Sequence, residues 1–266
     1  MTAAEATPSR HDLEALADGV IEAHHRGDTP FGLYVLPSRH AGAELARSVE
    51  REVFYEFFGN TPELLAEEYG PYEQASVYFC VLDHRRRQPV GVMRVIVPSE
   101  AGHKSVHDLE RVWGLDLPEV MARTGLEIDT DSLWDVATMA VRRDYRGDAT
   151  NGLISMALFQ TLGMLGDREQ VKSVISVLDL VVLDLIQTNV GRPLTMLDGV
   201  EPRRYLDSPS SLPGVLDAAD YKARLRFGHP DLFQLVFEGK GLETLVSGPR
   251  WELGIATDDE NSAAAS

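Results

Sequence analysis

Cysteine is almost absent from this chain. Cys80 is the only cysteine among 266 residues, which excludes an intrachain disulfide framework and a cysteine-based zinc site. Because Cys80 stands in a run of apolar and aromatic residues, we expect a small buried side chain and not a nucleophile.

Long hydrophobic segments are missing as well. No apolar run approaches the roughly 20 residues that cross a bilayer. The N-terminus also lacks the basic start and the apolar core of a signal peptide. We therefore expect a cytoplasmic protein with no membrane span.

Basic residues are scarce. Lys and Arg number 25 against 42 Asp and Glu, so the formal net charge is −17. A nucleic-acid binder needs a basic face, and the chain offers only the short clusters Arg85–Arg87, Arg142–Arg143 and Arg203–Arg204. We therefore expect no nucleic-acid partner, although a local patch can still receive an anionic cofactor or carrier.

Metal and phosphate motifs are also lacking. Among the histidines, only His103 and His107 have a spacing that would put them on one face of a helix, and no third ligand accompanies them. The chain has no serine nucleophile elbow, no P-loop and no dinucleotide fingerprint. We expect no bound metal.

What is present is an ordinary globular composition, 44% hydrophobic and 25% charged. We expect a disordered N-terminus over residues 1–10, one domain over 11–257 and a disordered acidic tail over 258–266. Apolar spacing predicts helices over 11–26, 45–57, 61–69, 108–112, 118–123, 179–189 and 218–227, and strands over 31–37, 75–82, 90–97, 134–141, 171–178 and 192–197. Residues 75–97 form a predicted antiparallel hairpin, 208–213 a loop, and 233–237 either a strand or a helix.

The chain is organised around Trp134–Leu158, which the pattern predicts to be a strand, a turn and a helix. The turn contains Gly147, Asp148, Asn151 and Gly152, residues that permit tight or left-handed backbone. Because a helix begins with unpaired N–H groups at the positive end of its dipole, this start is a candidate anion site.

The same residues resemble the GNAT acyltransferase superfamily, in which a turn after a valine-bearing strand, often with Tyr-Arg-Gly, holds an acyl-CoA pyrophosphate. Val141–Gly147 matches the leading part of that pattern, whereas Ala149 and Asn151 stand where glycines are usual. The resemblance implies an α/β (α+β) fold with a mixed, mostly antiparallel central sheet flanked by helices. It assigns cofactor binding to Met139, Val141, Arg146, Gly147, Asp148, Ala149, Thr150, Asn151 and Gly152.

A narrower resemblance is to the autoinducer synthases and the long-chain N-acyl amino acid synthases. It rests on Arg51–Phe54, on Gly91–Pro98 and on the pair Trp134 and Asp135. The chain departs from these families at Asp135, where glutamate is usual, and at Ala137–Thr138, where they have Ser-Arg.

In such enzymes an amine attacks a thioester directly, with a base for the ammonium proton and backbone donors for the oxyanion. The resemblance implies catalytic roles for Asp135 as the base, for Met139 as the oxyanion contact, and for Arg94, which either orients a substrate carboxylate or pairs with Asp135. Asp135 has a second interpretation, as a solvated rim residue or a structural partner of Arg94. Gln187 stands where many GNAT enzymes place a tyrosine acid, so Tyr34 or Tyr78 would have to supply one.

Two functions follow. The first is an N-acyltransferase that moves an acyl group from acyl-CoA or an acyl carrier protein to a small amine or amino acid, with Arg142, Arg143 and Arg146 as the patch that would recruit a carrier protein. The second is a catalytically silent module of the same fold that binds an acyl thioester or a protein partner. The oligomeric state stays open.

Overall fold

The structure of the protein, a computed structural model, describes residues 8–25 and 27–250. Its helices are α1 (Arg10–His24), α2 (Ala43–Phe58), α3 (Pro62–Tyr69), α4 (Lys104–Asp108), α5 (Leu117–Thr124), α6 (Leu153–Arg168), α7 (Leu180–Asn189), α8 (Ala218–Gly228) and α9 (Pro230–Glu238). Its strands are β1 (Phe31–Pro37), β2 (Ser76–Asp83), β3 (Gln88–Ile96), β4 (Leu133–Val141), β5 (Ser173–Asp179), β6 (Thr195–Met196), β7 (Arg203–Tyr205), β8 (Ser208–Asp217) and β9 (Val246–Arg250). Short helical turns are η1 (Gly70–Ala75), η2 (Leu109–Trp113), η3 (Thr130–Ser132), η4 (Arg143–Tyr145) and η5 (Gly147–Ala149).

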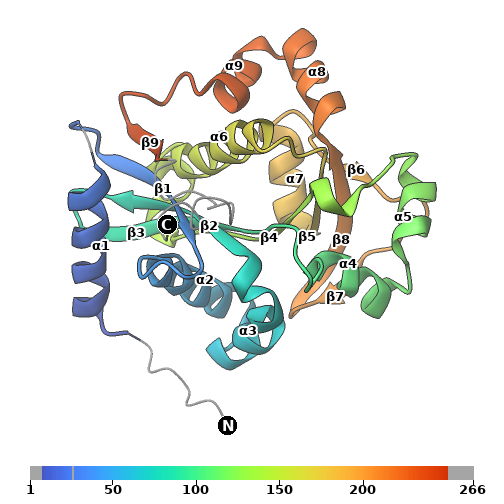
Figure 1. The fold of residues 1–266 in the computed structure, drawn as a ribbon, viewed down its shortest axis with the longest axis horizontal. Coiled ribbons are helices and arrows are strands. Elements are labelled where there is room, and N and C mark those ends of the chain that lie inside the picture. Colours follow the sequence, from blue (N-terminus) through green and yellow to red (C-terminus); the bar gives the residue numbers. More distant parts are fainter. Residues whose placement is uncertain (1–7, 26, 251–266) are drawn as a thin grey trace, which may run out of the picture.

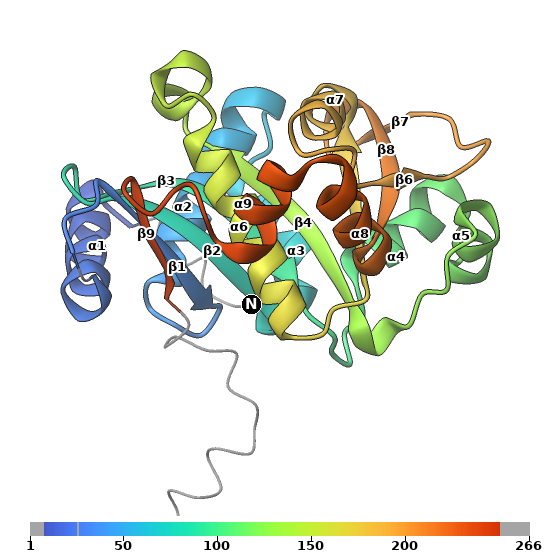
Figure 2. The ribbon, with the colours of Figure 1, turned by 90° about the horizontal axis from the view of Figure 1, so that it is seen from above.

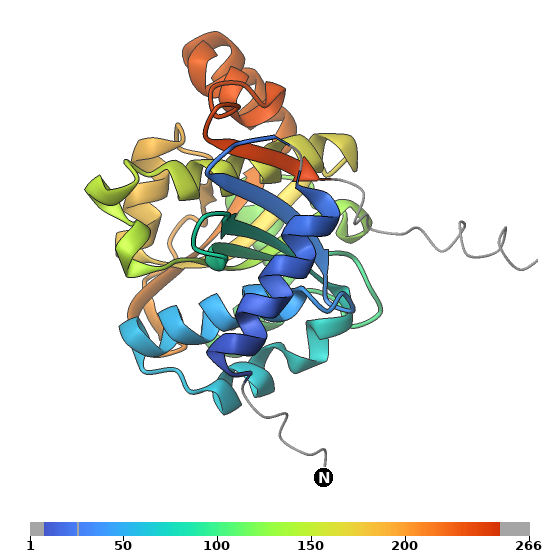
Figure 3. The same cartoon turned by 90° about the vertical axis from the view of Figure 1, so that its left-hand side faces the viewer.

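One mixed sheet forms the centre of the fold (Figure 1). Its strand order is β6-β8-β5-β4-β3-β2-β1-β9, and β7 pairs with β8. Helices α6, α8 and α9 lie over one face, and α2 and α3 lie under the other (Figure 3). The two faces bury separate apolar clusters, one with Leu158 and Val236 and one with Val49 and Tyr78. This is the α/β architecture of a mostly antiparallel sheet flanked by helices, as predicted.

The hairpin of β2 and β3 confirms the prediction for residues 75–97. The two strands are antiparallel, with Tyr78 opposite Arg94. Every residue of β2 is buried, because helices cover both faces of the sheet here, and this explains the continuous apolar run in its sequence.

The strands β4 and β5 run parallel, but they are paired only from Leu133 opposite Ser173 to Asp135 opposite Ile175. Ser176 then donates its hydroxyl to the Val136 carbonyl at 2.7 Å, and the backbone ladder to β5 ends. Because β4 continues along β3 to Val141, the far part of its other edge has no strand partner among the described residues.

The region after β5 differs from the prediction. Residues 208–213, predicted as a loop from their prolines and serines, are the first half of the strand β8, in which Pro213 lies opposite Val177. Proline lacks the N–H of a ladder donor and usually argues against a strand. Here the pairing of β8 with β5 extends on both sides of Pro213, from Ser211 opposite Asp179 to Asp217 opposite Ser173.

Other boundaries shift by smaller amounts. The strand predicted over 192–197 is reduced to β6, and residues 233–237 belong to the helix α9. Ser9 caps α1, because its hydroxyl accepts the N–H of Asp12. The acidic tail predicted over 258–266, and most of the N-terminal segment predicted over 1–10, lie outside the described residues.

In residues 8–25 and 27–250 we find no helix of the length and apolarity that a membrane crossing requires.

Candidate functional site

The open edge of β4 presents backbone N–H groups. The Arg142 N–H donates to the Val90 carbonyl at 2.9 Å, and β3 and β4 pair in register from Gly91 opposite Val141 to Arg94 opposite Thr138. Because successive residues of a strand direct their N–H groups to opposite sides, the amides of Met139 and Val141 point away from β3. They therefore face the side where β5 has diverged.

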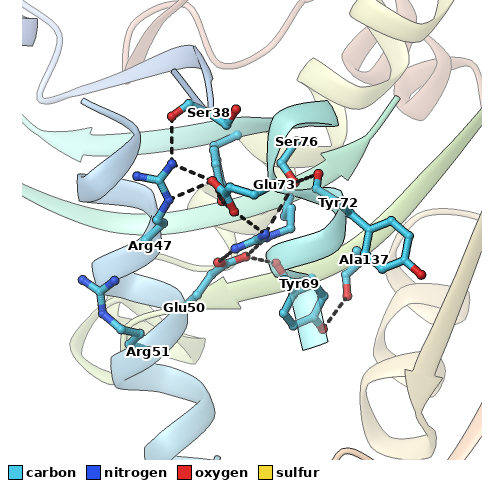
Figure 4. A network of polar contacts seen from close by, with 12 residues as sticks. Ser38, Arg47, Glu50, Arg51, Tyr69, Tyr72, Glu73, Ser76 and Ala137 are labelled. Carbon is cyan, nitrogen blue, oxygen red and sulfur yellow. Dashed lines mark hydrogen bonds and ion pairs between the residues drawn. The ribbon is translucent and has the colours of Figure 1, made fainter. Parts of the chain in front are cut away.

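A bulge interrupts β4 next to this edge. The register moves from Arg94 opposite Thr138 to Val95 opposite Val136, so Ala137 is left without a partner in β3. The Tyr69 hydroxyl approaches the Ala137 carbonyl at 3.5 Å (Figure 4). The unpaired, half-buried Ala137 of the bulge is thus within reach of a side chain from α3.

The turn between β4 and α6 has the left-handed backbone that its residues predicted. Gly147, Asn151 and Gly152 have φ angles of 52°, 48° and 74°. Asp148 and Ala149 lie in η5 and Thr150 ends it, and the Thr150 hydroxyl holds the turn by donating to the Tyr145 carbonyl at 2.7 Å.

The helix α6 begins after Gly152 without a side-chain cap and without an acidic residue in its first turn. The orphan N–H groups and the positive end of the dipole are therefore not neutralised by the helix's own side chains. In Figure 2 this end of α6 and the loop before it rise above the sheet beside the end of β4. A negatively charged group is favoured there.

The three arginines of this turn contact α2. Arg142 and Arg143 form ion pairs with Glu52 at 2.7 Å and Glu56 at 3.1 Å. The Arg146 guanidinium lies 4.2 Å from the centre of the Phe57 ring, and its Nε donates to the Val141 carbonyl. Arg146 therefore covers one end of the open edge of β4.

Asp135 lies at the start of β4, where the β4–β5 pairing ends. Its two carboxylate oxygens accept hydrogen bonds from the Ser105 backbone N–H and the Ser105 hydroxyl, both at 2.7 Å. The side chain is fully buried, and this burial raises the pKa of Asp135 to about 6, although Ser105 and the charge of Lys104 act in the opposite direction. The group titrates within the range of a general base.

Arg94 does not pair with Asp135, which corrects one interpretation of the sequence. Its guanidinium is held by the Glu50 carboxylate from α2 and by Glu73 from η1. The Thr138 hydroxyl donates to the same Glu50 carboxylate. Burial opposes the ionisation of Glu73, but the charges of Arg94 and Arg47 outweigh burial and lower its pKa. The Arg94 guanidinium is thus paired with two carboxylates, those of Glu50 and Glu73.

Tyr69 is a site residue that the sequence analysis missed. Its ring contacts two buried cations, with the Arg94 Cζ 4.6 Å and the Lys104 Nζ 5.1 Å from the ring centre. Burial raises the pKa of Tyr69 well above its ordinary value, with Glu50 acting in the same direction and Arg94 against it. The hydroxyl therefore stays protonated and acts as a hydrogen-bond donor.

The two tyrosines considered from the sequence contact other groups. The Tyr34 hydroxyl is 2.9 Å from His84 Nε2, and the Tyr78 hydroxyl donates to Glu73. Gln187 donates its amide to the Leu194 carbonyl at 3.0 Å. Of the side chains considered for the tyrosine role, Tyr69 is the one that hydrogen-bonds to β4, through its hydroxyl and the Ala137 carbonyl.

A second polar cluster adjoins Asp135. Lys104 Nζ contacts Glu68 at 2.7 Å, Asp108 at 2.5 Å and the Tyr205 hydroxyl at 3.1 Å. Burial opposes the ionisation of Asp108, but Lys104 overcomes it and lowers the pKa of Asp108. Polar side chains from six segments, α2, α3, η1, β3, α4 and β7, thus gather on one face of the sheet next to the point where β4 and β5 diverge.

No group of three or more histidine, cysteine, aspartate or glutamate side chains in the described part of the chain is arranged to hold a metal ion. His103 bonds the Leu133 carbonyl through Nε2, and His107 bonds the Tyr72 hydroxyl through Nδ1.

No family model matches the sequence, and no curated protein matches it. Solved structures do resemble it. The structure of a CoA-dependent acyl-homoserine lactone synthase, BjaI, with SAM and isopentyl-CoA superposes with a TM-score of 0.54 at 17% identity, over 84% of this chain and 96% of that one. The structure of FeeM, an N-acyl amino acid synthase from uncultured soil microbes, gives a TM-score of 0.54 at 12% identity, over 73% of this chain and 93% of that one. The likeness shows a shared fold, and the GNAT-like fold implied by the sequence resemblance is confirmed.

The structure brings part of the predicted site together. The gap between β4 and β5 opens after Asp135, where their pairing ends. Along the β4 side of this gap lie Met139, Val141 and then the turn from Arg146 to Gly152. Arg94 lies under the same strand but is occupied by Glu50 and Glu73. No local sequence signal indicated Tyr69 or Glu50, because their contacts come from α3 and α2, far from β4 in the chain.

Proposed function

We propose that this protein is an acyltransferase in which a small amine or amino acid attacks an acyl thioester at the open edge of β4. The single observation that carries the proposal is the early end of the β4–β5 pairing, which leaves the amides of Met139 and Val141 facing the gap. An extended amide-bearing arm of a thioester can pair with such an edge as an added strand does.

We place the donor on the α6 side. Its phosphates would meet the start of α6 and the turn from Arg146 to Gly152, and the Met139 amide would donate to the thioester oxygen. Coenzyme A and the phosphopantetheine of an acyl carrier protein share this arm, so both remain donors under the proposal. BjaI, a CoA-dependent enzyme, supports the first of them by its fold.

We place the acceptor on the opposite face. The α6 face of β4 is filled by apolar side chains such as Leu158 and Val141, whereas the other face carries Asp135, Thr138 and Tyr69. An ammonium group is better accommodated beside carboxylates and aromatic rings. FeeM, an N-acyl amino acid synthase, is consistent with an amino acid in this role.

In the reaction the ammonium loses one proton to Asp135, and the free amine attacks the thioester carbon. The C–N bond forms, an oxyanion develops, and the C–S bond then breaks. The second proton of the nitrogen passes to the departing thiolate through solvent, and Asp135 releases its proton afterwards. Ser105 donates one hydrogen bond to each oxygen of Asp135, and a carboxylate oxygen has a second lone pair, so the ammonium can donate to Asp135 while both bonds remain.

Tyr69 completes this mechanism as a second oxyanion donor. Its bond to the Ala137 carbonyl is 3.5 Å long, at the limit of a hydrogen bond, so little is lost when a substrate oxygen replaces that carbonyl. The contacts of the ring with Arg94 and Lys104 restrict its movement near the strand edge.

One observation favours a second candidate, a silent module that binds an acyl thioester. Asp135 is fully buried and both its oxygens are satisfied, as expected of a structural carboxylate. Under this alternative the donor still binds at β4, but no amine is acylated.

Thermal denaturation with acetyl-, octanoyl- and palmitoyl-CoA tests donor binding, because a ligand that binds only the native state raises the midpoint. We expect a rise that depends on the acyl group. If no donor shifts the midpoint, whether presented on coenzyme A or on an acyl carrier protein, both candidates are rejected.

A further inference from the structure

Two basic clusters that the proposed function does not use meet at one end of the sheet. Arg85–Arg87 lie in the turn between β2 and β3, and Arg142 and Arg143 follow β4. The antiparallel pairing of Gly91 with Val141 brings the start of β3 to the end of β4, so clusters more than 50 residues apart in the sequence become neighbours.

A cavity of about 440 Å³ lies at this meeting point. Its lining includes Arg10 from α1, Arg87, Arg142 and Arg143, together with the carboxylates of Glu14, Glu52 and Asp144. The lining thus carries four guanidinium groups and three carboxylates, a local concentration of arginine in a chain whose formal net charge is −17.

The arginines of the cavity keep donors available. Arg10, Arg87, Arg142 and Arg143 each form an ion pair through one nitrogen, with Glu14, Asp18, Glu52 and Glu56 respectively. A guanidinium has five N–H donors, and the more exposed of these ion pairs, those of Arg10, Arg87 and Arg143, contribute little. An anion with several oxygens can therefore bind these groups without a large cost.

The floor of the cavity is fixed in place. The buried Tyr145 hydroxyl accepts from Arg86 and Gln88, each at 2.9 Å, and donates to Asp83 at 2.7 Å. These bonds tie the β2–β3 turn to the turn that precedes α6. The backbone that carries Arg87 and Arg142 is thus fixed, which lowers the entropic cost of binding at this side of the cavity.

We propose that this cavity binds a small phosphate-bearing ligand, with Arg10 and Arg87 supplying charge-assisted hydrogen bonds from its outer rim. A phosphate group matches the fork of a guanidinium, and the volume exceeds that of a single phosphate. Two sources share this chemistry: the nucleotide end of coenzyme A, whose other phosphates would lie at α6, and a free phosphorylated metabolite. The site does not depend on acyl transfer.

Isothermal titration calorimetry of the full chain with pyrophosphate, with adenosine 3′,5′-bisphosphate and with adenosine tests the site. We expect saturable binding of at least one of the two anions and none of adenosine. Tighter binding of the bisphosphate than of pyrophosphate identifies the nucleotide source, and equal affinities identify phosphate recognition alone.

Variants at the rim locate the binding. Arg10→Ala and Arg87→Ala should each weaken anion binding by about tenfold, the usual effect of losing one charge-assisted hydrogen bond. Arg168→Ala, at the far end of α6, is the control and should leave the affinity unchanged. The proposal is overturned if neither anion binds, or if all three variants bind as the parent does. Acylation measured on the same samples would separate this outcome from a failure of the proposed function.

Discussion

Arg94 and Glu50 face each other in a two-bond ion pair between β3 and α2. The Nε–Oε1 distance is 3.0 Å and the Nη2–Oε2 distance is 2.6 Å, and both side chains are about 95% buried. Thr138 adds a third contact to the same carboxylate. The pair joins the helix α2 to the strand that carries the proposed site.

Glu50→Gln should destabilise the protein strongly. The substitution leaves the buried Arg94 charge with only Glu73 to balance it, which typically costs about 3–5 kcal/mol. Urea unfolding measures the loss. Glu44→Gln, which removes a more exposed partner of Arg47 and Arg51 on the same helix, is the control and should cost about 1 kcal/mol or less. If both variants lose the same free energy of unfolding, the buried Glu50 does not contribute more to stability than the more exposed Glu44, and the prediction is wrong.

Asp135→Asn should abolish the pH dependence of acyl transfer near pH 6. The pKa of Asp135 is raised to about 6, so the carboxylate that accepts the ammonium proton becomes available as the pH rises through that value. We expect the parent rate to rise across this range. The variant should lose about 100-fold or more in rate and show no inflection there.

Asp135 should also make the free energy of unfolding depend on pH: as the pH rises, its contribution to stability should fall, whereas the rate of acyl transfer should increase. Between its ordinary pKa of 3.8 and about 6 the native state binds more protons than the unfolded state, so the contribution of this group to stability falls as the pH rises. Unfolding of the parent and of Asp135→Asn at several pH values measures the difference. If their pH dependences coincide, the pKa of Asp135 is not raised.

Tyr69→Phe should lower kcat about 100-fold with little change in KM. It removes a donor to the oxyanion but leaves the ring in contact with Arg94 and Lys104. The inflection near pH 6 should remain, since it belongs to Asp135. Tyr72→Phe is the matched control: its hydroxyl contacts His107 at 2.6 Å and not β4. A loss of kcat in both variants would point to a structural role.

Gly152→Ala should weaken donor binding. Gly152 has a φ of 74°, and the space that a Cβ would occupy there has no other atom within 4 Å, so alanine is opposed by backbone conformation alone, at about 1 kcal/mol. Relaxation of the turn would displace the start of α6 and reduce the midpoint shift produced by acyl-CoA. Gly70→Ala, at an ordinary φ of −53° with equally open space, should leave that shift intact.

Local patterns predicted most of the fold. The apolar run of β4, the glycines of the turn and the helical spacing after Gly152 lie within one short stretch, so the sequence determines them locally. The loop prediction for residues 208–213 is wrong, because Pro209 and Pro213 favour a loop when only the local sequence is considered. Only the tertiary pairing of β8 with β5 makes them a strand.

Of the candidate site, the sequence predicts the donor-binding edge of β4 and the turn that follows it, but not the polar face of the sheet. Met139, Val141 and the turn to Gly152 belong to consecutive elements, and their spacing places them together. The partners of the polar face come from distant segments: Glu50 reaches Arg94 from α2, Ser105 reaches Asp135 from α4, and Tyr69 reaches Ala137 from α3. No periodicity encodes such contacts.

The most direct test of the central claim is to incubate the full chain with octanoyl-CoA and a mixture of amino acids and small amines, measuring thiol release and the products by mass spectrometry. The acyltransferase proposal predicts thiol release that requires an amine, together with the matching N-octanoyl amide, and both should diminish in Asp135→Asn. Binding of octanoyl-CoA with no amine-dependent thiol release and no amide, repeated with an octanoyl carrier protein as the donor, would contradict it and leave the silent thioester-binding module.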